Sequence, residues 1–429
     1  MFDAAAFLGI FFLLILIGVP VAYALGAAAV VLMLTVWQTP LSQVVIRLAA
    51  GPDSYAFIAV PLFILTGELM NTTGLTSRLV RFARATVGFI QGGLSHVVVV
   101  TNMLMAGISG SALADASATG GVLIPAMKMA GYRPSYAAAI VAASATIGPV
   151  IPPSIPMVLY GLTNNISIGR LFLGGVVPGV LMALFLIVAG YFKSKRAGYP
   201  VDARVPIAAQ ARSFGVALPA LVLPVLIVAG LVLGTFTPTE ASAVAVAGAL
   251  LIGGVAYREI TLKGIGHALH SSTVTSGAVM LIVASSALFG WVLALYQPGD
   301  KLAAAVADIS DNPQLILLFI NIVFIVLGCF LDTIPILLII VPLFVPLAER
   351  FSIDLVHFGV VIILNLMIGL LTPPYGLAML LTCRMAGVTV AEFWRDAWPF
   401  VIALMFVLGL ITYIPELVLF LPNIVMGPS

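Results

Sequence analysis

Charge is the scarcest property of this chain. Only 8% of its 429 residues are charged, whereas 62% are hydrophobic and the mean hydropathy is +1.22. A soluble domain carries roughly 25% charged residues, so this composition excludes an ordinary globular protein and indicates a polytopic membrane protein. The apolar runs are continuous rather than alternating, which favours an all-α protein over a β-barrel. A net charge of +2 indicates no preference for an anionic partner, and we expect no nucleic-acid partner.

Cysteine and the common catalytic motifs are also scarce or missing. The two cysteines, Cys329 and Cys383, both lie in apolar stretches, so no disulfide framework or CxxC metal site is possible. The sequence has no GxxxxGK[ST] loop, no HExxH and no GxSxG motif, which excludes the chemistry that each supports. We therefore expect no enzyme activity, no catalytic residue and no organic cofactor. The energy for any transport must come from an ion gradient or from a partner chain.

Apolar runs bounded by glycine, proline or charge predict about ten transmembrane segments. Their predicted ranges are 5–18, 20–37, 55–72, 134–164, 171–192, 214–233, 239–256, 272–296, 354–386 and 397–421. The N-terminus carries an acidic residue and no basic residue before the first apolar run. We therefore expect it to be retained as the first span rather than cleaved as a signal peptide.

Helix-breaking residues form a gap-free internal repeat. The first copy is Gly107, Pro125, Gly148, Pro152 and Pro153, and the second, 221 positions later, is Gly328, Pro346, Gly369, Pro373 and Pro374. At the same offset, Ser111 lies opposite Asp332. Broken helices at matching positions of two membrane halves are the best sequence pointer to the binding site of a secondary transporter. We predict two repeats, 1–192 and 214–429, joined by a cytoplasmic linker at 193–213.

Each predicted repeat contains a broken apolar pair followed by a broken helix. The pairs at about 95–129 and 312–349 are predicted to be re-entrant hairpins, and the helices at about 134–164 and 354–386 are unwound at their double prolines. The positive-inside rule places every basic cluster in the cytoplasm if the hairpins are re-entrant, and also if both arms of each hairpin span fully. The apolar arms are short for full crossing, so we favour re-entrant hairpins. The first then opens to the cytoplasm and the second to the outside, which makes the repeats inverted copies.

Oxygen-bearing side chains stand at both hairpin tips. Glycine frees backbone carbonyls at the first tip, and these carbonyls with the hydroxyls of Ser109 and Ser111 would form a hard oxygen cage suited to sodium. The alternative is a kink stabilised by serine bonding back to its own helix. Asp332 is the one charged residue in the run from Leu315 to Leu347. An intramembrane carboxylate is expected to bind a cation, carry a proton or contact substrate, and otherwise to be a paired structural acid.

Several further polar residues have two interpretations. Half-helices that begin after the breaks point their N-termini inward, where their dipoles suit a carboxylate of the substrate. Asp115, just after the first tip, is either part of that site or a structural cap. Glu240 follows Pro238 and is expected to cap a helix. The row of Arg78, Arg81 and Arg84 predicts an amphipathic helix that either lies on anionic lipid or acts as a structural brace.

Five segments together resemble the large membrane subunit of the TRAP class, the tripartite ATP-independent periplasmic transporters. They are LIGVPVAYALG at 16–26, GISGSALADAS at 107–117, GPVIPPS at 148–154, TPTEAS at 237–242 and LTPPYG at 371–376. The resemblance implies a sodium-driven, elevator-type importer of organic acid anions in the bacterial inner membrane. It also implies two partners, which are a periplasmic substrate-binding protein and a small four-helix membrane subunit that is here a separate chain.

The resemblance further implies positions for the bound species. The first sodium site maps to Ser109, Ser111 and Gly148, the second sodium site maps to Gly328, Asp332, Gly369 and Thr372, and the substrate maps to Ser111, Ser154 and Asp332. C4-dicarboxylates are the first expectation for the substrate and sialic acid is the second. One alternative is a stand-alone sodium-coupled anion carrier without a binding protein. A remote alternative is an intramembrane enzyme that acts on lipid substrates.

Overall fold

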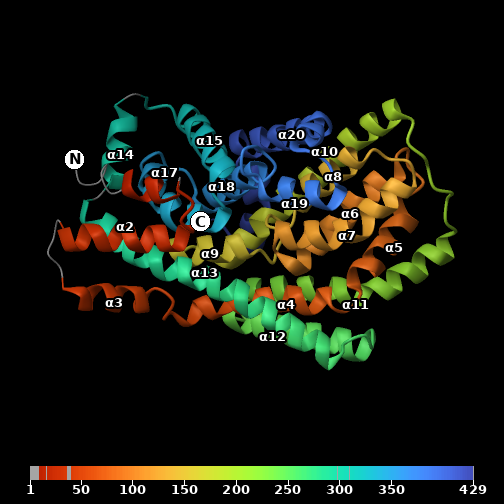
Figure 1. The fold of residues 1–429 in the computed structure, drawn as a ribbon, viewed down its shortest axis with the longest axis horizontal. Helices are drawn as coiled ribbons and strands as arrows, with labels where there is room; N and C mark the ends of the chain where they lie inside the picture. Colours follow the sequence, from red (N-terminus) through yellow and green to blue (C-terminus); the bar gives the residue numbers. More distant parts are fainter. Residues whose placement is uncertain (1–8, 16, 36–39, 297, 309, 429) are drawn as a thin grey trace.

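The computed structural model describes residues 9–15, 17–35, 40–296, 298–308 and 310–428. Every regular element in these ranges is helical, which confirms the predicted all-α class (Figure 1). The elements before the linker are α2 (Val21–Thr35), α3 (Leu41–Ala50), η1 (Tyr55–Ile58), α4 (Ala59–Asn71), α5 (Leu75–Val87), α6 (Gly93–Ser109), α7 (Ala112–Met129), α8 (Pro134–Ala145), α9 (Ile155–Asn164) and α10 (Ile168–Ala197). The elements after it are α11 (Ile207–Val232), α12 (Pro238–Leu251), η2 (Ile252–Ala256), α13 (Leu262–Tyr296), α14 (Pro298–Ala307), α15 (Pro313–Phe330), α16 (Thr333–Pro335), η3 (Ile336–Ile340), α17 (Val341–Arg350), α18 (Leu355–Gly369), α19 (Leu377–Ala386), α20 (Val390–Tyr413) and α21 (Glu416–Met426).

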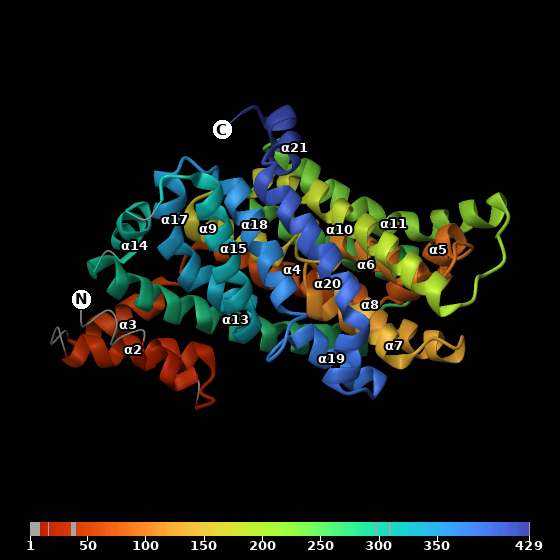
Figure 2. The same ribbon diagram turned by 90° about the horizontal axis from the view of Figure 1, so that it is seen from above.

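The helices form two packed groups, and each group contains helices from both halves of the chain. In one group, α4 packs on α12 and α13, and α13 also packs on α2 and α3. In the other group, α8 packs on α6, α7, α19 and α20, while α15 packs on α18. Figure 1 shows the first group along the lower side of the molecule and the second above it, and Figure 2 shows the same helices from above. Segments that are distant in sequence therefore meet in each group.

Fewer helices than expected are long enough to cross a membrane alone. The described residues contain seven such helices, or up to eight if the pair Leu41–Ala50 and Tyr55–Asn71, bent by 57°, counts as one span. The difference from ten arises because the predicted spans 134–164 and 354–386 are each made of two short helices. The segment 20–37 contains α2, which has only 15 residues, and the segment 5–18 lies partly outside the described residues. The two arms of the predicted second hairpin, Pro313–Phe330 and Thr333–Arg350, are each long and apolar enough to cross a membrane, so the expectation that the hairpin arms are too short is wrong for this hairpin.

The predicted last span, 397–421, is wrong in its boundaries. Helix α20 begins earlier, at Val390, and ends at Tyr413, and α21 is a separate helix. Proline disfavours helical backbone in the residue before it. Ile414, which precedes Pro415, accordingly has φ −125° and ψ 78°.

A buried carboxylate ties three helices of the second group together. Asp396 of α20 is 2% exposed, and its Oδ1 lies 2.9 Å from Lys193 Nζ on α10 and 3.5 Å from Arg133 Nη2. Ser135, in the first turn of α8, donates a hydrogen bond of 2.6 Å to the other carboxylate oxygen. Removing water from a carboxylate is costly, so these three partners compensate for its burial.

Candidate functional site

A cavity of about 290 Å³ lies where the breaks of several helices converge, and we call it the tip cavity. Its walls come from the two hairpin tips, the start of α9, the end of α18, and the helices α4 and α13. The described residues that line it are Ile64, Gly67, Glu68, Asn71, Ser109, Gly110, Ser111, Ala112, Leu113, Ala114, Pro149, Ile155, Pro156, Thr275, Ala278, Val279, Ile282, Asp332, Thr333, Ile334, Met367 and Leu370. Its volume is at the lower end of the roughly 300–1,000 Å³ typical of small-ligand pockets.

The first tip turns at a left-handed glycine. Gly110 has φ +59°, which a residue with a side chain rarely adopts, and it separates the end of α6 from the start of α7. A Cβ on Gly110 would lie 2.6 Å from the carbonyl oxygen of Pro153. The tip therefore packs directly against the non-helical segment between α8 and α9. Ser111 caps α7 by accepting a hydrogen bond of 3.4 Å from the Ala114 amide.

Asp115 joins the first tip to the neighbouring break. Its side chain is 0% exposed, and its Oδ1 accepts a hydrogen bond of 2.6 Å from Ser109 Oγ. Its Oδ2 is also buried and has no hydrogen-bond partner among the described residues. A Cβ on Gly148 would contact this second oxygen. The structure thus brings Ser109, Asp115 and Gly148 together, and Ser111 is adjacent through its amide, which donates to Ser109 Oγ. An unpartnered buried carboxylate oxygen beside a hydroxyl fits the oxygen ligands of a hard cation.

The second tip lies against its own neighbouring break. A Cβ on Gly369 would lie 2.5 Å from the carbonyl carbon of Gly328, so the two backbones touch without side chains between them. The Tyr375 amide donates a hydrogen bond of 3.1 Å to the Cys329 carbonyl, which fixes the end of α15 against the segment before α19. Thr372 donates its hydroxyl hydrogen to the Ile368 carbonyl at 2.8 Å. Gly328, Gly369 and Thr372 therefore cluster behind the cavity and are not among its lining residues.

Asp332 caps the helical stretch that begins at Thr333. Its Oδ1 accepts a hydrogen bond of 2.7 Å from the Thr333 amide, and its side chain lines the tip cavity. The Thr333 hydroxyl is buried and has no hydrogen-bond partner among the described residues. The capping role accounts for one carboxylate oxygen of Asp332 and leaves the other oxygen available.

The double prolines lie outside any helix, but Ser154 lies apart from the cavity surface. Helix α8 ends at Ala145 and α9 begins at Ile155, so Pro152 and Pro153 fall between them, and Pro373 and Pro374 fall likewise between α18 and α19. The peptide bond within each pair is cis. Ser154 is 1% exposed, donates to the Pro149 carbonyl at 2.5 Å and accepts from the Met157 amide at 3.2 Å. The bond from the Met157 amide caps α9, and the bond to Pro149 ties Ser154 to the non-helical segment before that helix. Ser154 does not line the cavity.

The wall formed by α4 and α13 contains three polar residues that the sequence analysis did not assign to the site. Glu68 and Asn71 lie on α4, and Thr275 lies on α13. The sequence offered one signal for this wall, because Glu68 is the one charged residue within the predicted span 55–72. Nothing in the sequence indicated that α4 and α13 pack together across the tips. Within the described ranges, no three His, Cys, Asp or Glu side chains cluster as transition-metal ligands would.

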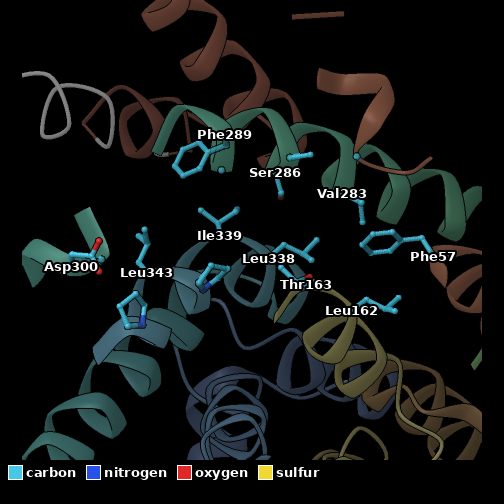
Figure 3. A pocket seen from close by; sticks show the side chains of 16 residues that line it. Phe57, Leu162, Thr163, Val283, Ser286, Phe289, Asp300, Leu338, Ile339 and Leu343 are labelled. Carbon is cyan, nitrogen blue, oxygen red and sulfur yellow. The ribbon is translucent and has the colours of Figure 1, made fainter. Parts of the chain in front are cut away.

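Two other cavities flank this region. A polar cavity of about 500 Å³ shares Glu68, Asn71 and Ala114 with the tip cavity and extends along the starts of α5 and α7. A mainly apolar cavity of about 620 Å³ lies between α13 and α17 (Figure 3), where Phe289 and Leu343 face each other across it. The polar cavity thus meets the tip cavity at the wall that carries Glu68.

The arginine row acts as a structural brace. Arg78 forms a 2.6 Å ion pair with Glu259, and Arg84 forms one of the same length with Asp202 in the linker. Hydrogen bonds from Arg78 lower the pKa of Glu259 below its ordinary value. These pairs support the brace interpretation. The predicted cap is confirmed, because Glu240 and Thr237 form a reciprocal capping box at the start of α12.

Comparisons with known proteins agree over almost the whole chain. The family described as "Tripartite ATP-independent periplasmic transporter, DctM component" matches residues 8–417. The sialic acid TRAP transporter large permease protein SiaM of Vibrio cholerae is 40% identical over 96% of this chain and 97% of its own length. The C4-dicarboxylate TRAP transporter large permease protein DctM of Pseudomonas aeruginosa is 37% identical, with 93% of each chain covered.

A solved structure supports the fold independently of sequence. The YdaH transporter of Alcanivorax borkumensis superposes with a TM-score of 0.65 over 90% of each chain, at 15% identity. At that identity the likeness concerns the fold alone. The relatives above are transporter permeases, so this chain is not an enzyme, and the alternative of an intramembrane enzyme is excluded.

Proposed function

Because this chain belongs to the DctM-component family of tripartite ATP-independent periplasmic transporters, we propose that it imports an organic acid anion by coupling it to sodium. It is a multi-pass membrane protein of the TRAP class, and we place it in the bacterial inner membrane. The observation that carries the sodium proposal is the buried Asp115 Oδ2, which has no described partner and lies beside Gly148. A sodium ion held there by this oxygen and by Ser109 would compensate for the burial of the carboxylate.

The second sodium ion is proposed to lie at the other tip. Gly328 and Gly369 bring two backbones into contact at the ends of α15 and α18. The last carbonyl groups of a helix have no hydrogen-bond partner within that helix. Asp332 and Thr372 add a carboxylate and a hydroxyl oxygen nearby in the chain. Carboxylate and carbonyl oxygens are the ligands that hard cations prefer.

The substrate is proposed to occupy the tip cavity with a carboxylate toward the tips. The N-terminus of α7 meets the cavity at Ala112, Leu113 and Ala114, and that of α9 meets it at Ile155. Each helix N-terminus carries roughly half a positive charge, so both favour an anionic group. Sodium ions at the tips would add to this potential, which couples binding of the anion to binding of the ions. Ser111 and Asp332 would contact the substrate, whereas Ser154 would act through the α9 cap.

The movement is proposed to be of the elevator type. The helices that carry the tips and breaks form the packed group α6–α10 and α15–α20, which would move against the group that contains α2–α4 and α11–α13. The two inverted repeats, 1–192 and 214–429, each supply one hairpin and one broken helix to the moving group. Sodium and substrate bound together would neutralise the charges at the tips and permit the movement.

Two partners complete the proposed transporter. One is a periplasmic substrate-binding protein that delivers the organic acid, and the other is a small membrane subunit. Fused relatives exist, since the sialic acid TRAP transporter permease protein SiaT of Haemophilus influenzae matches 97% of this chain over 68% of its own length.

Uptake into proteoliposomes tests this function. The vesicles contain this chain with its small subunit, and uptake of labelled N-acetylneuraminate and labelled succinate is measured with and without an inward sodium gradient and the cognate binding protein. Uptake that requires both conditions and is lost in Asp332→Ala supports the proposal. Uptake with sodium alone favours a stand-alone carrier, and uptake that ignores the sodium gradient contradicts the coupling.

A further inference from the structure

The groove between α13 and the second hairpin contains two cavities in succession. The residues of α13 that line the tip cavity are Thr275, Ala278, Val279 and Ile282. Those that line the apolar cavity of about 620 Å³, which we call the outer cavity, are Val283, Ser286, Ala287, Phe289 and Gly290. The hairpin accompanies α13 along both cavities, because Ile334 lines the tip cavity while Leu338 and Leu343 line the outer cavity (Figure 3). The outer cavity is therefore the continuation of this groove beyond the second tip.

The tip cavity opens toward the predicted cytoplasmic side. The polar cavity that adjoins it at Glu68 and Asn71 reaches Thr76 at the start of α5. Helix α5 carries the arginine row, which the positive-inside rule places in the cytoplasm. The proposed movement must carry the tips away from this side, and the outer cavity is the space that lies in that direction along α13.

Ser286 is the one polar side chain that the group of α2–α4 and α11–α13 offers to the outer cavity among the described residues (Figure 3). The other residues with which this group lines the cavity are Gly51, Phe57, Val283, Ala287, Phe289 and Gly290. Ser286 is 7% exposed, and its hydroxyl has no hydrogen-bond partner in the part of the chain that the structure describes. Burying a hydroxyl without a partner costs free energy, so this position calls for a partner that the present arrangement does not supply.

We propose that Ser286 takes the place of Thr275 in the substrate site once the tips have advanced by three helical turns along α13. This proposal rests on the function and the movement proposed above. The two residues are 286 − 275 = 11 positions apart, which in an α-helix corresponds to about 16.5 Å and to almost the same direction around the axis. The substrate would thus leave the hydroxyl of Thr275 on one side of the membrane and meet the hydroxyl of Ser286 on the other.

The neighbouring wall changes its chemistry over the same distance. Phe57 lines the outer cavity and stands 68 − 57 = 11 positions before Glu68, within the stretch Tyr55–Asn71. A substrate at the outer position would therefore lie beside Phe57 rather than beside Glu68 and Asn71. Ser286 would then supply the one hydrogen bond from this group, so its removal should have a clear effect in that state alone.

A disulfide between α13 and the hairpin tests the proposed displacement. Gly290→Cys and Ile334→Cys are introduced together after both native cysteines are replaced by alanine, and membranes are oxidised with copper phenanthroline. In this structure Leu343 faces Phe289 across the outer cavity (Figure 3), and Ile334 precedes Leu343 by nine residues, or roughly 13 Å of helix. Disulfide-linked Cα atoms are about 4.4–6.8 Å apart, so we expect this pair to link only when the tip has advanced.

Binding to the linked and the reduced forms then tests Ser286 itself. N-acetylneuraminate and succinate are titrated at saturating sodium chloride against the purified chain with its small subunit in nanodiscs, and thermal unfolding is followed. We expect Ser286→Ala to raise the half-saturation concentration of the acid that binds by about 2- to 12-fold in the linked form, as for one lost hydrogen bond. The reduced form should be little changed, because its tips lie at Thr275. Thr275→Ala should show the reverse pattern.

Two further variants serve as controls. Ser286→Thr keeps the hydroxyl and should bind as the parent does in the linked form. Ser285→Ala removes the neighbouring hydroxyl, which is also buried but lies near α2, where a Cβ on Gly26 would be 3.5 Å from its Oγ. This variant should leave both forms unchanged. The unfolding temperature without ligand reports whether each variant is folded.

The proposal is overturned if the disulfide does not form, if neither acid binds the linked form, or if Ser286→Ala weakens both forms alike. Its failure differs from failure of the proposed function. Sodium-driven, binding-protein-dependent uptake without the disulfide would retain the function and reject the displacement by three turns. A disulfide and a selective effect of Ser286→Ala, together with uptake that ignores the sodium gradient, would retain Ser286 and reject the coupling.

Discussion

One added methyl group at Gly369 tests the geometry of the second break. An alanine Cβ would lie 2.5–2.6 Å from the Cα, carbonyl carbon and oxygen of Gly328. Non-bonded carbon atoms prefer about 3.5–4.0 Å, so the ends of α15 and α18 must separate by about 1 Å. Backbone atoms cannot swing away as a flexible side chain does. Overpacking of this kind costs about 1–3 kcal/mol, so we expect Gly369→Ala to lower the free energy of unfolding by that amount.

The same substitution should weaken sodium binding. If carbonyl oxygens of Gly328 and Gly369 hold the second sodium ion, the separation displaces ligands that must stay within a few tenths of an ångström. If this cost of about 1–3 kcal/mol destabilises the sodium-bound state, the apparent affinity for sodium falls by about 5- to 150-fold. The assay is thermal unfolding of the purified chain over a sodium chloride titration, with choline chloride holding the ionic strength constant.

Gly409→Ala is the matched control. Gly409 lies in α20, and a Cβ there meets no atom within 4 Å. Alanine is favoured over glycine in a helix by up to about 1 kcal/mol, so this variant should be as stable as the parent or slightly more stable. If the two variants behave alike, the close approach of the two backbones is refuted. If Gly369→Ala lowers stability but leaves the sodium titration unchanged, the packing argument holds and the second sodium site must lie elsewhere.

Three further predictions concern stability. Asp396→Ala removes the ion-pair partner of the half-buried Lys193 and should cost about 1.5–3 kcal/mol, which is measurable as a lower unfolding temperature in detergent. Thr237→Ala removes one bond of the capping box at α12 and should cost about 1 kcal/mol in the same assay, whereas an unchanged unfolding temperature would contradict a contribution of the cap. The lowered pKa of Glu259 means that its pair with Arg78 stabilises the fold above the ordinary carboxyl pKa of about 4.3 and loses that effect as pH falls through the folded pKa. Glu259→Gln should therefore differ from the parent at pH 7 and converge with it at strongly acidic pH, although the exposed position of Glu259 keeps the effect small.

The helix boundaries near the breaks could be predicted because they follow from local chemistry. Glycine and proline act on the backbone of their own turn, so the double prolines fall between α8 and α9 and between α18 and α19, as predicted. The outer ends of these helix pairs also lie close to the predicted limits of 134–164 and 354–386. Capping is equally local, as at Glu240. The division into 1–192, 193–213 and 214–429 stays a prediction, since it concerns topology in a membrane rather than the helices themselves.

The wall that α4 and α13 form could not be predicted because it depends on packing between distant segments. Glu68 and Thr275 are 207 positions apart, and they meet at one cavity because α4 packs along α13. Polar residues are spread around helix α13 near this point, since Ser271, Ser272, Thr273, Thr275 and Ser276 are close together in the chain, so its periodicity does not reveal which side faces the tips. The misplaced end of α20 has a similar cause, because hydropathy continues across Pro415 although the helix does not.

The two tips also show that repeated breaks need not carry repeated chemistry. The repeat pairs Gly107 with Gly328 and Gly148 with Gly369, but only in the second copy do the two glycines lie against each other, whereas Gly148 of the first copy lies against the Asp115 carboxylate. The carboxylates do not follow this symmetry. Asp115 stands in the first turn of α7, where the matching position in the second copy, 221 residues on, is Ile336. Asp332 instead occupies the position of Ser111, at the cap itself and at the cavity surface. One carboxylate is thus fully enclosed behind its tip, while the other faces the space proposed for the substrate. If Asp115 and Asp332 each form an ion site, we expect the two sites to bind their ions one after the other. The reason is that only the Asp115 site is separated from the substrate cavity by its own tip.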